Sequence, residues 1–248
     1  MQVNRARVNQ QADNITKLTK SASNVIRESL TDDMPLDDII RLADTVSEAY
    51  ANMSGAVTAQ FYNDIRAAAK PPSKFTATKH THYLTADTRK AVVAVYEEYA
   101  AGRATVPLAN LVSDIVARNI KKAADATISV NGSRDTSKPR YAIVPTGDAC
   151  AFCVMRASNG YTYELPDAVN SHDHCSCVAT PVWGSMTVQG YDVEKYRSMW
   201  REARDAYYGD DLSDDMYDKI DDQWDEKGKE FSNTKAILMV MREQQGLK

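Results

Sequence analysis

Apolar side chains recur at every third or fourth position over most of residues 4–69, the spacing of an amphipathic helix. The first stripe, within 4–30, is Val8, Ala12, Ile15, Leu18, Ala22, Val25 and Ile26. A second stripe follows Pro35 and continues to about residue 69, which predicts a helix roughly 50 Å long. A helix of this length needs a packing partner, so we expect another helix in coiled-coil-like contact with it. Gly55 weakens its middle, and we expect a bend there.

Residues 70–84 break this periodicity with Pro71 and Pro72 and then become basic and polar, which predicts a loop or linker. We expect His80 and His82, both on this linker, to be surface residues. Thr85 can cap a further helix over 86–101, and Pro107 can open another over 108–124. The first half of the chain is therefore predicted to be helical.

The pattern changes after residue 126. Residues 127–145 mix β-branched side chains with the turn signal Asn131-Gly132, so a hairpin is compatible with this stretch. Short strands are predicted over 141–144 and 177–182, and a loop over 184–190. Helical spacing returns over 193–207, and a last helix over 234–245 is expected to end at Gly246.

We therefore predict a mainly α protein with long N-terminal helices, a small α+β segment with short strands, and C-terminal helices. Its regions are a helical N-terminal part over 1–125 (long helices in 1–69, the linker, and helices in 85–125), a Cys/His segment over 126–185 and an acidic helical part over 186–248. Within the last part, residues 209–226 are strongly acidic. They are interrupted at helical spacing by apolar residues, which makes them a candidate docking segment: Leu212, Met216, Tyr217, Ile220 and Trp224.

The four cysteines of the chain lie close together in the middle region, beside two of its four histidines. Cys150 and Cys153 form a C-x-x-C pair, and a tight turn at this spacing can direct both sulfurs to one zinc ion. The second half of the cluster supplies His172, Cys175 and Cys177, a sulfur and imidazole set suited to zinc. These five candidates, with His174 as a sixth, exceed the four ligands of a structural zinc site.

Two alternatives stay open for the cysteines. They could be buried thiols that act as small hydrophobic side chains, or they could form two disulfides after release from a reducing cell. The N-terminal sequence has no apolar segment typical of a signal peptide, so we expect synthesis in a reducing cytoplasm, which favours a metal over disulfides.

The stretches VPTGDACAFCVMRASNG and HDHCSCVATPVW resemble the phage Mu protein F-like minor head (head morphogenesis) proteins, most closely those of phages of actinobacteria. Cys150 and Cys153 match the family's first element, and His172, Cys175 and Cys177 match its H-x-x-C-x-C element. Asp173 stands where the family more often has proline. The resemblance covers about 40 residues, and it would carry the helix after Pro107 to about Asn131.

The resemblance implies a structural protein of the virion, made in the host cytoplasm and located near the portal vertex. It implies the phage portal protein and the major capsid or scaffolding protein as partners, with phage DNA as a further candidate, and roles in head assembly and DNA ejection. The net charge of −4 argues against a surface built as a whole for nucleic acid. No membrane span, catalytic residue, cofactor other than structural zinc, or small-molecule substrate is expected.

Two alternatives belong to other functional classes. A zinc-supported nuclease of the ββα-metal type would use His172 or His174 as general base, with Asp173 or Asp148 as helper. The chain lacks the following helix with spaced histidines that this site needs. A DNA-binding module would use the positively charged stripe of the first helix, formed by Arg5, Arg7, Lys17, Lys20 and Arg27.

Overall fold

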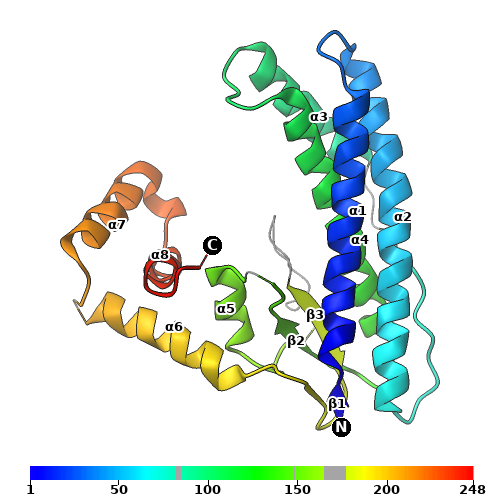
Figure 1. Ribbon diagram of the computed structural model, residues 1–248, viewed down its shortest axis with the longest axis vertical. Coiled ribbons are helices and arrows are strands. Elements are labelled where there is room, and N and C mark those ends of the chain that lie inside the picture. The colour runs from blue at the N-terminus through cyan, green and yellow to red at the C-terminus, as the bar shows by residue number, and fades with distance from the viewer. Residues whose placement is uncertain (82–84, 148, 165–176, 210, 248) are drawn as a thin grey trace.

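The computed structural model describes residues 1–81, 85–147, 149–164, 177–209 and 211–247. Helices α1 (Arg5–Ser29), α2 (Leu36–Ala69) and α4 (Leu108–Arg134) lie side by side and form a long arm, with α3 (Thr85–Ala100) packed near one end (Figure 1). Short strands lie at the other end of the arm, and the C-terminal helices lie beyond them. The described chain is therefore mainly helical, as the periodicity predicts.

Apolar packing between the helices holds the outer part of the arm together. Ile26 of α1, Ile39 of α2, Val92 of α3 and Val116 of α4 belong to one cluster and are almost completely buried. The Asn4 side chain caps α1 by accepting a hydrogen bond of 2.8 Å from the backbone N–H of Ala6. The long second helix thus packs against two others, as its length leads us to expect.

Helix α2 continues through Gly55, and the structure gives this glycine a packing role. A Cβ atom at this position would lie 3.2 Å from Oγ1 of Thr127 and 3.4 Å from the carbonyl oxygen of His80. Gly55 therefore lets α4 and the extended chain near His80 approach α2 closely.

Helix α4 runs to Arg134 and passes through the Asn131-Gly132 turn signal. The Thr127 hydroxyl donates to the carbonyl oxygen of Ala123 at 2.8 Å, and the Asn131 amide donates to the carbonyl oxygen of Thr127 at 2.7 Å. The hairpin that residue propensity allows here is absent, because packing against α2 favours the helix.

A two-stranded antiparallel sheet follows the arm. Strand β2 (Arg140–Val144) pairs with β3 (Val178–Val182), and Tyr141 lies opposite Pro181. A second pairing was not predicted: β1 (Gln2–Val3) runs parallel to β4 (Thr187–Val188), within the stretch predicted as a loop. Tyr62, Tyr141 and Trp183 lie in the apolar cluster that joins these strands to the base of the arm.

The C-terminal helices form a third apolar cluster. Helix α5 (Ala151–Ala157) packs against α6 (Val193–Tyr208) and α8 (Asn233–Gln245), and α7 (Asp214–Lys227) with the short 3-10 turn η2 (Gly228–Glu230) completes the group. Asp192, Ser213 and Ser232 cap α6, α7 and α8, and Gly246 ends α8 with a φ of 59°, as predicted.

The acidic segment packs its apolar side inward. Met216 and Ile220 of α7 are only 5% and 4% exposed, and both belong to the cluster formed with α8. At these two positions the amphipathic segment therefore packs on the rest of this chain, which leaves neither side chain exposed for a partner protein. In the described part of the chain, no helix has the length and apolar character needed to cross a membrane.

Candidate functional site

Cys150 and Cys153 lie at the beginning of helix α5, immediately after the loop that leaves β2. Cys150 is the N-cap residue, and Cys153, in the first turn, is 2% exposed. Their sulfur atoms are 3.3 Å apart. Two thiolates on one tetrahedral zinc lie about 3.8 Å apart, so a shift of a few tenths of an ångström would suit a metal. The pair is placed by a helix start rather than by the tight turn that we predicted.

Contacts from two other segments hold the carboxyl end of α5. The Tyr191 hydroxyl donates to the carbonyl oxygen of Ala157 at 2.6 Å, and Nε of Arg197 donates to the carbonyl oxygen of Ser158 at 2.9 Å. The buried Arg156 guanidinium lies over the ring of Tyr163 at 5.3 Å. The helix that carries the cysteine pair is therefore fixed to α6 and to the sheet region.

Cys177 precedes β3, at the same end of the two-stranded sheet as Val144, because Val178 pairs with Val144. It is half-buried and packs on the sheet cluster together with Tyr196. The pKa of Tyr196 is raised, mainly because the side chain is partly buried. The nearby Arg5 charge acts in the opposite direction, and Cys177 adds to the increase. Cys177 thus lies within electrostatic reach of a half-buried phenol on α6.

His172 and Cys175 lie outside the described residues, as do Asp148, Asp173, His174 and His82. Among the residues that the structure does describe, no three His, Cys, Asp or Glu side chains gather as a metal site. The zinc site at Cys150, Cys153, His172, Cys175 and Cys177 therefore stays a prediction. His80 is only partly exposed, and its backbone N–H and carbonyl both bond to Oγ1 of Thr127, at 3.1 and 2.8 Å.

Arg5 links the first helix to the loop before the cysteine pair. Its Nη2 donates a hydrogen bond to the carbonyl oxygen of Pro145, which follows β2. Arg7 pairs with Asp64 at 3.4 Å, and Nε of Arg27 donates to Asn110 at 3.0 Å. Three of the five basic side chains proposed as a DNA-facing stripe are therefore bonded within the protein.

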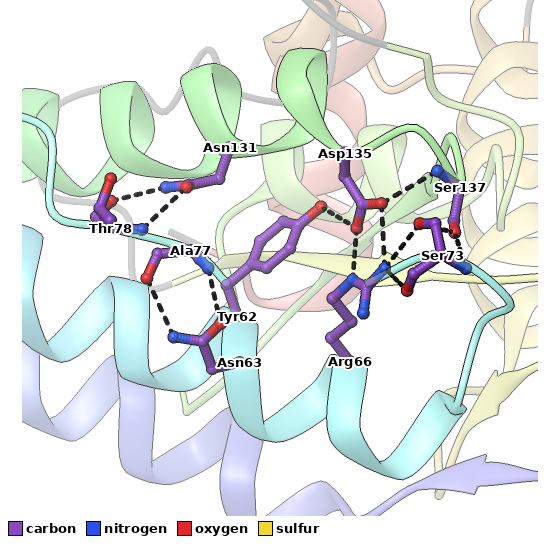
Figure 2. A network of polar contacts seen from close by, with 9 residues as sticks. All are labelled: Tyr62, Asn63, Arg66, Ser73, Ala77, Thr78, Asn131, Asp135 and Ser137. Atoms are coloured by element: carbon purple, nitrogen blue, oxygen red, sulfur yellow. Dashed lines mark hydrogen bonds and ion pairs between the residues drawn. The ribbon is translucent and has the colours of Figure 1, made fainter. Parts of the chain in front are cut away.

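A buried ion pair, which the sequence pattern does not predict, joins the ends of α2 and α4 (Figure 2). Nε of Arg66 lies 2.7 Å from Oδ2 of Asp135, a side chain with no exposed area, and the Tyr62 hydroxyl donates to the same oxygen at 3.2 Å. Burial alone would raise the pKa of Asp135, but hydrogen bonds from Arg66 and the Ser137 backbone outweigh it and lower this pKa. Burial raises the pKa of Tyr62, with Tyr141 and Asp135 acting in the same direction.

One sequence signal could have located this pair. Arg66 lies four residues after Tyr62, on the apolar stripe of α2, where a charged side chain is buried only if a partner is available. The partner is 69 residues away in sequence, and no spacing rule identifies it.

The extended chain of residues 70–81, which we call the strap, is held by side chains of the arm. The side-chain oxygen of Asn63 accepts a hydrogen bond of 2.7 Å from the backbone N–H of Ala77, and its amide nitrogen donates one of 3.0 Å to the Ala77 carbonyl oxygen. Asn131 does the same for Thr78, at 3.0 and 2.8 Å (Figure 2). The stretch predicted as a linker therefore contains a strap with a fixed path.

These features define a mainly helical protein in which a buried polar junction, formed by Tyr62, Arg66, Ser73, Asp135 and Ser137, ties the base of the long arm to the strap. A small sheet and the helix that carries the cysteine pair follow the arm in the chain. The chain belongs to the VG15 protein family, a viral or phage protein family, whose model matches residues 2–203. The match runs from β1 into α6 and leaves α7 and α8 outside. No curated protein and no solved structure matches the chain.

Proposed function

We propose that this chain is a structural minor capsid (head morphogenesis) protein of a tailed bacteriophage or prophage, associated with the portal vertex. The observation that carries the proposal is membership of the VG15 family over residues 2–203, the region that contains both the arm and the helix with the cysteine pair. The resemblance of residues 144–160 and 172–183 to Mu F-like head proteins supports the same role.

The shape of the arm suits assembly with other head proteins. Helix α2 has 34 residues, which corresponds to about 50 Å, and its outer end lies far from the sheets (Figure 1). A long helical bundle offers its sides and tip to the portal protein and to the major capsid or scaffolding protein. In this proposal the role is one of contact, and no residue is catalytic.

Zinc is the second part of the proposal. Cys150 and Cys153, 3.3 Å apart, would supply one half of the site, and His172, Cys175 and Cys177 would supply the other. Four ligands from this set would close a structural site and connect α5 to the start of β3. Binding would stabilise this segment by an amount on the order of 10 kcal/mol.

The zinc proposal is tested by measuring metal content and thiol reactivity on the same sample. Protein purified without chelator is expected to contain about one zinc per chain, with thiols that react only after denaturation. Cys153→Ser should release the metal, whereas Ser158→Ala, a control at the other end of α5, should retain it. Zinc-free protein with four reactive thiols would remove the metal site, and the absence of both zinc and thiols would indicate disulfides.

The head-assembly proposal is tested separately, by co-expression with the portal protein of the same phage. We expect the two proteins to co-purify and particles made without this chain to be defective. Well-formed, infectious particles that lack the chain would refute the role.

The nuclease alternative has a direct test as well. The proposed structural role predicts no cleavage of plasmid DNA in the presence of Zn²⁺ or Mg²⁺. Cleavage that disappears in His174→Ala would refute a purely structural role.

A further inference from the structure

We propose that the beginning of the strap, the last residue of α4 and the turn after it together form a contact surface for the phosphate backbone of duplex DNA. The surface, called the basic face, consists of Lys70, Lys74, Arg134 and Lys138, all exposed. This inference goes beyond the proposed function, since neither zinc nor a portal contact enters it.

Charge is the first observation behind the basic face. The two segments that build it are residues 70–81 and 133–140, and their one acidic residue is Asp135. Its carboxylate has no exposed area and is bonded to Arg66. Both segments therefore present only positive charge to solvent, although the whole chain has a net charge of −4. A local excess of exposed positive charge of this kind favours polyanions.

Buried polar contacts also hold the two segments together. The hydroxyl oxygens of Ser73 and Ser137 are 2.5 Å apart, and Nη2 of Arg66 donates to the Ser73 carbonyl at 2.6 Å (Figure 2). Lys74 and Lys138 are each one residue away from these serines, so their Cα atoms lie within roughly 15 Å of each other. The junction thus fixes the positions from which the charges project.

Backbone conformation gives an independent reason to assign function to two of the lysines. Lys70, with a φ of 47°, and Lys138, with a φ of 46°, are the two non-glycine residues with positive φ in the described chain. Glycine or asparagine would adopt this conformation at lower energetic cost. Because both positions carry lysine and both side chains are exposed, we infer that the charge itself is used there.

Duplex DNA is the partner that this chemistry fits. Lysines bind phosphates as point charges on flexible stems, and they need no base contact to do so. Binding through the basic face should therefore be independent of sequence and should weaken steeply as the salt concentration rises.

The test measures fluorescence anisotropy of a labelled 30-base-pair duplex of arbitrary sequence with the full chain, from about 50 to 200 mM NaCl. The test variant combines Lys70→Asn, Lys74→Gln and Lys138→Asn; asparagine suits the backbone at 70 and 138, so folding should be preserved, and thermal unfolding checks this. The control variant, Lys90→Gln with Lys122→Gln and Lys229→Gln, removes the same charge from exposed positions on α3, α4 and η2.

We expect the test variant to lose at least about tenfold in affinity at low salt and to reduce the slope of log K against log salt by about 2 to 3. The control should lose less than about threefold. Equal losses in both variants, or no binding by the unsubstituted chain, would overturn the proposal. Tighter binding to polyglutamate than to DNA, lost in the test variant, would also overturn it and would indicate an acidic protein as the partner.

Discussion

The outer arm and the junction at its base are both well buried, but different forces hold them. In the outer arm, apolar side chains such as Ile39, Val116 and Ile120 fill the space between the helices. At the junction, the buried Arg66 and Asp135 charges satisfy each other, and asparagine amides satisfy the backbone of the strap. The stability that apolar packing provides falls in steps as side chains are shortened. Removing one partner of a buried ion pair instead destabilises the protein strongly, because the other charge stays buried without compensation.

The largest effect should come from removing one charge at the junction. Asp135→Ala is expected to lower the free energy of unfolding by about 3–5 kcal/mol, because the Arg66 charge would stay buried with only its hydrogen bonds to Ser73 and no carboxylate. Urea unfolding followed by circular dichroism measures this. The control is Asp64→Ala, which breaks the exposed pair with Arg7 and should cost at most about 1 kcal/mol. Equal losses in the two variants would show that burial does not distinguish the pairs.

Trimming the arm should produce a loss of a different kind. Ile120→Ala is expected to cost about 2–5 kcal/mol through lost burial and a cavity, since Ile120 is fully buried. Ile120→Val should cost only about 0.5–1.5 kcal/mol, which gives the graded response of apolar packing. Losses as large for valine as for alanine in urea unfolding would contradict this view of the arm.

A smaller effect should appear in how the stability of the two regions depends on pH. The folded chain lowers the pKa of Asp135, so the stability that this carboxylate contributes is present above its unfolded pKa and is lost as pH falls through the folded pKa. The stability difference between the unsubstituted chain and Asp135→Asn should therefore shrink below about pH 4. The difference for Ile120→Ala should change less over the same range. A difference for Asp135→Asn that is constant from pH 7 to 3 would refute the assignment.

The smallest effect is expected where the strap meets α2. Gly55→Ala would normally stabilise a helix, but here the new Cβ would lie 3.2 Å from a Thr127 hydroxyl held by His80 and Ala123. We expect a net loss of about 1 kcal/mol. The exposed neighbour Ala56→Gly should lose a similar amount by helix propensity alone. Increased thermal stability of Gly55→Ala would show that the strap can move away.

The sequence predicts the arm better than the junction, and the reason is physical. Apolar periodicity is a local property, so it locates α1, α2 and α6, and the glycine after α8 marks its end. The continuation of α4 to Arg134 and the pairing of Arg66 with Asp135 depend on contacts between distant segments. The position of Cys150 and Cys153 beside each other follows from their spacing, whereas the zinc itself stays a prediction.

The parallel pairing of β1 with β4 also affects the order of folding. Gln2 pairs with Thr187, so the register joins positions 185 residues apart. Closing so long a loop is entropically costly and slow, and during synthesis it must wait until β4 has left the ribosome. We expect the helices of the arm to form early through local contacts, while residues 2–3 stay unpaired. The contact that joins the first residues to the sheet region would then be among the last to form.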